Sequence, residues 1–182
     1  APDGCMTSQM VTVDPLPTIG AGSNVAICSG TSTGLTATGG GSYYWSPASG
    51  LSCTNCANPT AMPGSTTTYT VTGYNVLTVC SNPSTVTVSV TPLPYVYTVT
   101  DGGNYCAGGA GVHVGVDTSN AGINYQLYNG MTTSGSPMGG IDASLDFGLE
   151  TAAGTYMVIA TDTTTGCTNT MDGSATVTII PV

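Results

Sequence analysis

The same strand ending occurs three times in this chain, and it constrains the fold more than any other feature. It reads Val-Thr-Val-Asp-Pro-Leu-Pro at 11–17, Val-Ser-Val-Thr-Pro-Leu-Pro at 88–94 and Val-Thr-Ile-Ile-Pro-Val at 177–182. Each copy is an alternating stretch stopped by proline, which cannot donate a hydrogen bond to a sheet. Self-similarity of this kind indicates a tandem array of β domains.

Alternation with a period of two recurs elsewhere in the chain. An apolar side chain stands at every second position over 68–72, 85–90, 156–160 and 177–179. Half-buried strands have this pattern, and glycine pairs or triplets separate the stretches. The sequence therefore predicts an all-β fold without long helices.

The repeated ending also sets the predicted domain boundaries. We expect 1–17 to be an extra N-terminal strand, equivalent to the last strand of a preceding unit. Two tandem Ig-like β-sandwich domains follow, over 18–92 and 93–182. The Pro-Leu-Pro linkers are short and stiff, which favours a rod of units over flexibly tethered domains.

The composition excludes several classes of partner. Lys and Arg are absent, Asp and Glu total 9, and the formal net charge is −9. Without cations the chain cannot neutralise nucleic acid phosphates or bind an anionic membrane surface. No apolar run is long enough for membrane insertion, and no secretory leader begins the sequence, so we expect a mature protein or a piece of a longer one. Drift in a repetitive gene is the alternative explanation for the missing cations.

Seven cysteines indicate the disulfide framework of a secreted chain, with one thiol left over. The domain map predicts the pairs Cys28–Cys80, Cys53–Cys56 and Cys106–Cys167. The remaining thiol, Cys5, is assigned with Val11 and Val13 to an inter-unit contact, whose partner lies upstream in a longer chain or in a neighbouring subunit. Two alternatives stay open: a redox site at 53–56, and zinc bound by Cys28, Cys53, Cys56 and Cys80.

The stretch around the only Trp is the most distinctive part of the sequence. Residues 44–59 read Tyr-Trp-Ser-Pro-Ala-Ser-Gly-Leu-Ser-Cys-Thr-Asn-Cys-Ala-Asn-Pro, and 66–71 read Thr-Thr-Thr-Tyr-Thr-Val. They resemble the Ig-like and PKD-like repeats of giant secreted surface proteins of Bacteroidota. Four stretches of the second half resemble a sister repeat, namely 104–109, 124–130, 151–156 and 165–170.

This resemblance implies an exported, cell-surface or released protein that is adhesive or gliding-associated and has no catalytic residues. It also makes Thr163, in Asp-Thr-Thr, a candidate O-glycosylation site. Members of the family contain some Lys and Arg, so their absence here is a departure.

Few side chains suggest chemistry. His113 alternates with valines, so we expect it on the outer face of a strand, without a nucleophile. Asp142, Asp146 and Glu150 resemble the paired acids of a glycosidase, but they lie in an alternating strand. We therefore predict no enzyme and no cofactor, with calcium near Asp14 or Asp101 at a domain junction as an alternative.

The predicted function is structural. We expect a non-enzymatic repeat unit of an extracellular filament, stalk or giant surface adhesin, whose units self-associate by strand addition or follow one another as tandem repeats. The alternative is an adhesive module that recognises glycans or a host protein. Tyrosines that could stack on sugars are Tyr43, Tyr95, Tyr97, Tyr125 and Tyr128.

Overall fold

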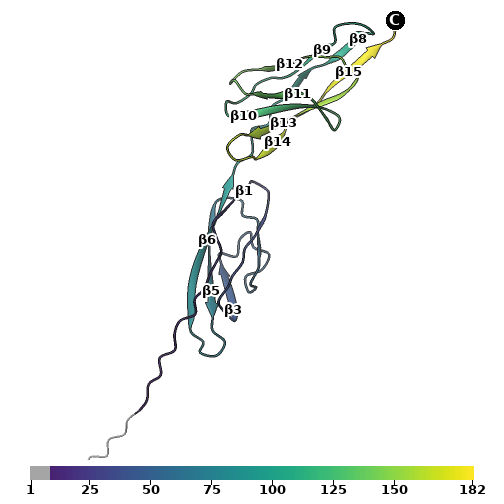
Figure 1. Cartoon of the computed structure of the whole chain (residues 1–182). Coiled ribbons are helices and arrows are strands. Elements are labelled where there is room, and N and C mark those ends of the chain that lie inside the picture. The colour runs from purple at the N-terminus through teal and green to yellow at the C-terminus, as the bar shows by residue number, and fades with distance from the viewer. Residues whose placement is uncertain (1–8) are drawn as a thin grey trace, which may run out of the picture. The chain divides into compact units, whose positions relative to one another are not determined.

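The computed structural model describes residues 9–182, and this part of the chain is built from strands without a helix (Figure 1). It divides into two compact units, Ala1–Val90 and Thr91–Val182. The division falls close to the boundary at 92/93 that the Pro-Leu-Pro repeat predicts. Residues 9–182 contain no helix that could cross a membrane.

The first unit has a sheet in the order β1-β6-β5-β3 and a short β2-β4 pair. Its alternating Thr, Tyr and Val residues place apolar side chains on one face of each strand. The strands are β1 (Val25–Cys28), β2 (Thr33–Gly34), β3 (Ser42–Ser46), β4 (Thr60–Ala61), β5 (Thr67–Tyr74) and β6 (Ser81–Thr91).

The register of β3, β5 and β6 builds the first core. Trp45 pairs with Val71, and Tyr69 pairs with Val86, and these four side chains are fully or almost fully buried. On the opposite face, Thr68 and Thr87 are joined by a hydroxyl hydrogen bond of 2.9 Å. The alternation predicted from the sequence thus separates a core face from a solvent face.

The second unit is a sandwich of two sheets. The larger has the order β11-β10-β13-β15-β8, with β14 beside β13, and the smaller has the order β12-β9-β7. The strands are β7 (Val99–Asp101), β8 (Gly103–Cys106), β9 (Val112–Val116), β10 (Ile123–Asn129), β11 (Thr132–Gly139), β12 (Leu145–Glu150), β13 (Gly154–Asp162), β14 (Thr168–Thr170) and β15 (Ala175–Ile180).

The second core lies between these sheets. Val114 and Val116 come from the smaller sheet and pack with Leu127, Tyr156 and Val158 of the larger one. β8 runs parallel to β15 and forms an edge of the larger sheet. Residues 9–182 therefore form an all-β fold of two tandem Ig-like domains.

Residues 9–17, which we call the lead-in segment, do not form the predicted extra N-terminal strand. Residues 9–17 belong to no strand, and Met10, Val11 and Val13 are more than 80% exposed. The physical reason is that a single strand without a neighbour has nothing to satisfy its backbone groups. Cys5 lies outside the described residues.

Two of the three predicted disulfides are wrong. The structure joins Cys53 to Cys56, whose Cα atoms are 6.0 Å apart. Cys80 and Cys106, however, are free thiols, whereas Cys28 and Cys167 are disulfide-bonded. Neither Cys28–Cys80 nor Cys106–Cys167 is therefore present. Spacing along the chain cannot fix a pairing that depends on the distance between Cβ atoms in space.

The same observation contradicts the zinc alternative, and the loop context of the 53–56 disulfide disfavours the redox alternative. Because Cys28, Cys53 and Cys56 are disulfide-bonded, a four-thiolate zinc site that includes Cys80 is not available. The 53–56 disulfide closes a loop over Trp45 and not the start of a helix. Trp45 donates from its indole nitrogen to the Cys56 carbonyl at 3.0 Å, and from its backbone nitrogen to the Thr54 carbonyl at 2.7 Å.

Candidate functional site

The most distinctive local structure is a hydrogen-bonded turn that occurs once in each unit. We call residues 75–82 with Pro17 the first clamp, and residues 162–169 with Pro94 the second clamp. In the second clamp, the Asp162 backbone nitrogen donates to the Cys167 carbonyl, and the Gly166 nitrogen donates to the Asp162 carbonyl, both at 2.9 Å. The Asp162 carboxylate accepts from the Thr164 nitrogen at 2.8 Å.

The first clamp repeats these bonds atom for atom. The Asn75 nitrogen donates to the Cys80 carbonyl and the Val79 nitrogen donates to the Asn75 carbonyl, both at 2.9 Å. The Asn75 side-chain oxygen accepts from the Leu77 nitrogen at 2.9 Å. Asn and Asp oxygens both stabilise turns in this way, so the two sequences build one structure.

Each clamp ends in an asparagine that holds the incoming chain. Asn82 donates from its side chain to the Pro17 carbonyl at 3.1 Å, and Asn169 donates to the Pro94 carbonyl at 2.9 Å. Both prolines are the second one of a Pro-Leu-Pro sequence. The same kind of hydrogen bond, from asparagine to proline, therefore holds the lead-in segment on the first unit and the chain that leaves β6 on the second unit.

The sequence analysis does not predict the clamps, although the sequence contains a repeated pattern at both of them. Cys-Ser-Asn at 80–82 and Cys-Thr-Asn at 167–169 share a spacing, and a Thr stands two residues before each Cys. In the structure these threonine hydroxyls accept from the cysteine nitrogens at 3.4 and 3.3 Å. Short polar repeats of this kind gain meaning only when the folded chain shows what they contact.

The two clamps differ in charge and polarity. Asp162 carries a charge where Asn75 is neutral, and hydrogen bonds from the Thr164 and Thr165 nitrogens hold the pKa of the Asp162 carboxyl below its usual value. Thr163 is exposed, and its hydroxyl donates to the Gly122 carbonyl at 2.8 Å. Its glycosylation remains a prediction.

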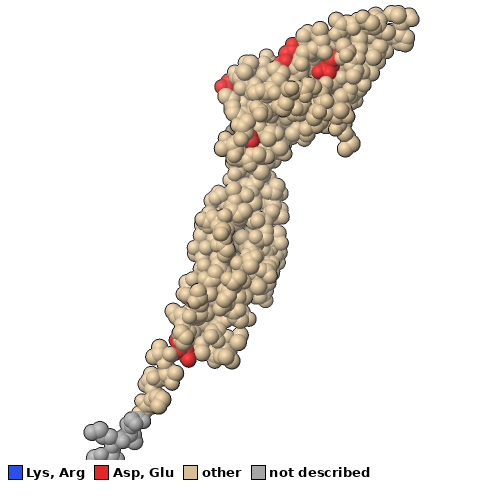
Figure 2. Space-filling view, viewed as in Figure 1, with Lys and Arg blue, Asp and Glu red and all other residues tan. Residues whose placement is uncertain are grey.

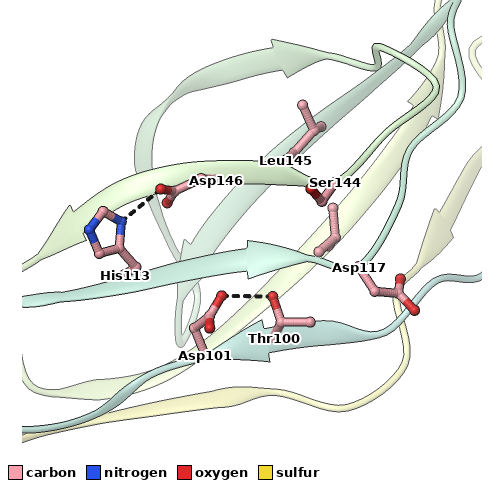
Figure 3. A pocket seen from close by; sticks show the side chains of 8 residues that line it. Thr100, Asp101, His113, Asp117, Ser144, Leu145 and Asp146 are labelled. Carbon is pink, nitrogen blue, oxygen red and sulfur yellow. Dashed lines mark hydrogen bonds and ion pairs between the residues drawn. The ribbon is translucent and has the colours of Figure 1, made fainter.

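A pocket of the second unit is open to solvent and is lined by the only His of the sequence (Figure 3). The His113 Nδ1 and Asp146 Oδ2 atoms are 2.7 Å apart, and both side chains are more than half exposed. The hydrogen bond from the Gly148 nitrogen, followed by that from His113, lowers the pKa of Asp146. An ion pair this exposed contributes roughly 0–1 kcal/mol.

This arrangement lacks an activated nucleophile. Ser144 lines the same pocket, but among the described hydrogen bonds none joins it to His113 (Figure 3). Asp142 binds the Ala121 nitrogen at 2.9 Å, and Glu150 accepts from Ser134 at 2.8 Å. Each of the acids singled out in the sequence thus has its own structural partner.

The described residues offer little to a cation. Residues 9–182 contain no group of three or more His, Cys, Asp or Glu side chains that could hold a metal ion. Asp101 accepts from the Thr100 hydroxyl at 2.9 Å, and Asp14 lies in the exposed lead-in segment. Figure 2 shows acidic side chains as separate patches on an otherwise uncharged surface. Calcium at these positions remains a prediction.

The tyrosines divide between core and surface. Tyr125 is fully buried, burial raises the pKa of its hydroxyl, and that hydroxyl accepts from the Asn120 nitrogen at 3.0 Å. Tyr97 donates to the Asn120 side chain at 2.7 Å, and Tyr43 donates to the Gly40 carbonyl at 2.8 Å. Tyr95 is 76% exposed and borders a hollow of about 220 Å³.

Comparison with known proteins supports the fold. No family model and no curated protein matches the sequence. Among solved structures, the N-terminal eight Ig domains of Down Syndrome Cell Adhesion Molecule match 89% of this chain and 27% of their own length, with a TM-score of 0.56 and 16% identity. Titin domains I67–I69 match 91% of this chain and 66% of their own length, with a TM-score of 0.48 and 15% identity.

A bacterial example is also similar. Fibronectin(III)-like modules of Clostridium thermocellum CbhA match 89% of this chain and 95% of their own length, with a TM-score of 0.40 and 10% identity. At 16% identity the likeness to the cell adhesion fragment, whose TM-score exceeds 0.5, concerns the fold alone. The chain spans about two thirds of the titin fragment and about a quarter of the cell adhesion fragment.

Proposed function

We propose that this chain is a non-enzymatic structural repeat unit of an extracellular filament, stalk or giant surface adhesin. In this proposal, copies join end to end, and the lead-in segment of one copy adds as a strand to the neighbouring copy. The disulfides fit an oxidising, extracellular setting. The resemblance to Bacteroidota surface repeats supports the same setting.

The observation that carries this proposal is the duplicated clamp. At Pro94 the clamp holds a chain that has just left β6, a paired strand of a folded unit. At Pro17 an equivalent clamp holds the end of the segment 9–17, which has the same strand ending but pairs with no strand among the described residues. We infer that the first clamp also follows the last strand of a folded unit, and that a second copy supplies the rest of that unit.

The lead-in segment has the alternating apolar side chains of a strand, and these side chains are exposed. Val11 and Val13 are 81% and 86% exposed, whereas at the matching positions of β6 Val88 is buried and Val90 is partly buried against the core. Covering two valines contributes about 1.5–3 kcal/mol each. Edge strands such as β8 and β11 have unpaired backbone groups that can accept another strand.

The test is assembly of the purified chain, observed by electron microscopy. We expect filaments from the wild-type chain and none from the double variant Val11→Asp, Val13→Asp, because the carboxylates would be buried against the neighbour. Thr12→Asp is the matched control, since its side chain points to the other face of an added strand. Filaments from the double variant at wild-type abundance would contradict the proposal.

The second candidate function is an adhesive module that recognises glycans. It is favoured by Tyr95, which is exposed beside the hollow lined by Pro92, Leu93 and Ile123. A reproducible signal on a glycan array that is lost in Tyr95→Ala, and kept in the control Tyr44→Phe at an exposed tyrosine of the first unit, would establish it.

A further inference from the structure

The two units have cysteines at equivalent positions, and these cysteines differ in their bonding. One position ends the edge strand beside the last strand of each unit: Cys28 ends β1, beside β6, and Cys106 ends β8, beside β15. The other position lies in the clamp and is occupied by Cys80 and Cys167. Cys28 and Cys167 are disulfide-bonded, and Cys106 and Cys80 are free. One thiol of each kind is therefore available.

Cys80 lies where the chain enters the first unit, in the clamp that holds Pro17. The turn around it exposes apolar side chains: Val76 is 69%, Leu77 is 89% and Val79 is 78% exposed. The second clamp has Thr163, Thr164 and Gly166 at the corresponding positions. The first clamp alone therefore presents an apolar surface, which we call the entrance patch, and such a surface favours contact with a protein partner.

Cys106 lies where the chain leaves the second unit. It stands opposite Ile180 in the parallel β8–β15 register, and the Ala107 nitrogen donates to the Ile180 carbonyl at 2.9 Å. Ile179, Ile180 and Val182 are 38%, 46% and 99% exposed. Cys106 and Ile180 are register partners on one face of the sheet, and with Val182 we call them the exit patch, which is also apolar and also contains a free thiol.

The charge of the chain favours contact between these two patches. The side chains that give the formal net charge of −9 are all acidic, so two copies repel each other. The entrance patch and the exit patch contain no carboxylate side chain. Contact between them buries apolar area without bringing acidic side chains together.

We propose that the exit patch of one copy binds the entrance patch of the next, and that Cys106 of the first copy forms a disulfide with Cys80 of the second. This inference rests on the proposed function, because it seals covalently the end-to-end contact that strand addition makes. The assembly would then be a covalent polymer with one such disulfide at each contact between copies.

The bond forms by thiol–disulfide exchange with a low-molecular-weight disulfide, RSSR, as the oxidant. The Cys106 thiolate attacks RSSR, forms a mixed disulfide and releases one RS⁻. The Cys80 thiolate of the next copy attacks the Cys106 sulfur and releases the second RS⁻. Two protein thiols are oxidised by two electrons, RSSR is reduced to two thiols, and the two protons pass to the released thiolates.

The test uses the full chain assembled with oxidised glutathione and separated on a non-reducing denaturing gel. We expect a ladder of covalent multimers that reductant collapses to monomer. Mixing ¹⁴N and ¹⁵N chains and digesting with pepsin, since trypsin has no cleavage site, should yield Cys80–Cys106 peptides of mixed isotope composition by mass spectrometry. Peptides joined only within one isotope would overturn the inference.

Two matched variants fix the direction of the contact. Cys80→Ser and Cys106→Ser should each lose every band above the monomer when assembled alone. Mixed in equal amounts, they should form covalent dimers and nothing larger, because each retains one of the two thiols. A ladder from Cys80→Ser alone would show that Cys106 uses Cys5, and dimers from it would show a symmetric Cys106 contact. Either result overturns the proposal.

Electron microscopy of the same samples separates this inference from the proposed function. Filaments without a Cys80–Cys106 peptide would refute the disulfide and leave strand addition intact. Absence of filaments and of multimers from the wild-type chain would refute both. Circular dichroism of the two variants, with Cys→Ala versions alongside, checks that loss of multimers does not come from misfolding.

Discussion

At the scale of single residues, Trp45 shows how the first unit is held together without the predicted disulfide. Its side chain is fully buried, and its indole N–H satisfies the Cys56 carbonyl in the 53–56 loop. Immunoglobulin cores pack a Trp on an inter-sheet disulfide. Here the Trp instead contacts a short disulfide loop, so one residue joins the sheet to a connection that contains little regular structure.

This contact predicts the outcome of two substitutions. Trp45→Phe should lower the free energy of unfolding of the first unit by about 2 kcal/mol, because the Cys56 carbonyl loses its donor and a small cavity opens. Trp45→Ala should cost about 4 kcal/mol. Urea unfolding followed by circular dichroism measures both, with the exposed Tyr44→Phe as a control within about 0.5 kcal/mol. An unchanged urea midpoint for Trp45→Phe would show that the hydrogen bond to the Cys56 carbonyl does not stabilise the unit.

Asp162 makes the second unit sensitive to acid in a way that the first clamp is not. Backbone hydrogen bonds from Thr164 and Thr165 lower the pKa of this carboxyl in the folded state. Its stabilisation is therefore present above the unfolded pKa, about 3.9, and is lost as the pH falls through the folded pKa. Asn75 makes the equivalent bond without a charge.

We therefore expect Asp162→Asn to keep the clamp and reduce the loss of stability between neutral pH and acid. Scanning calorimetry of the second unfolding transition at both pH values measures this. Asn75→Asp is the reciprocal variant and should make the first unit acid-sensitive, as followed by the fluorescence of Trp45. A second unit whose acid response is unaltered in Asp162→Asn would show that other carboxylates dominate.

At the scale of elements, the two clamps are the same turn, but they differ in the residue that stands at the position of positive φ. Position 79 and position 166 both have positive φ, 59° and 73°, but Val79 is β-branched where Gly166 has no side chain. A non-glycine residue in this region costs roughly 1–2 kcal/mol. The first clamp thus keeps an unfavourable backbone conformation together with an exposed apolar side chain.

This comparison predicts that Val79→Gly stabilises the first unit. The expected gain in the free energy of unfolding is about 0.5–1 kcal/mol. Glycine removes the cost of the left-handed conformation, and the greater conformational entropy that it gives the unfolded chain offsets part of this gain. Urea unfolding monitored by Trp45 fluorescence measures it. Gly166→Val is the reverse substitution in the second clamp and should destabilise the second unit. A less stable Val79→Gly variant would mean that the valine side chain makes contacts that outweigh the backbone cost.

At the scale of the whole molecule, the absence of cations makes self-association depend on screening. With a net charge of −9, copies repel over a Debye length of about 30 Å at low salt and about 8 Å at physiological ionic strength. The surface in Figure 2 has no positive side chain to offset this repulsion. In the proposed assembly, contact between copies must therefore come from apolar area and backbone pairing.

Assembly should accordingly accelerate as salt is added. Light scattering at low and physiological ionic strength should show a faster rise at the higher value, because association of like-charged chains speeds up when their charges are screened. Asp14→Asn, which removes a charge next to the strand ending of the lead-in segment, should reduce the salt dependence. Assembly that slows with salt would indicate that attractive charge pairs drive the contact.

The sequence by itself determined the class of fold and the strands of the two units, but not the state of the N-terminal segment. Period-two alternation dictates which face of a strand is apolar, so the burial of Tyr69, Val71 and Val158 could be predicted from local pattern alone. Proline after each strand ending marked the division of the chain for an equally local reason: its missing N–H stops a ladder wherever it stands.

Only the tertiary structure decided the cysteine bonding and the clamps. A disulfide or a side-chain hydrogen bond depends on distances between atoms far apart in sequence, as with Asn82 and Pro17 or Asn169 and Pro94. The same holds for Val11 and Val13, whose alternation predicts a strand but whose pairing requires a neighbouring strand. Local pattern fixes what a segment can become, and the surrounding chain fixes whether it does.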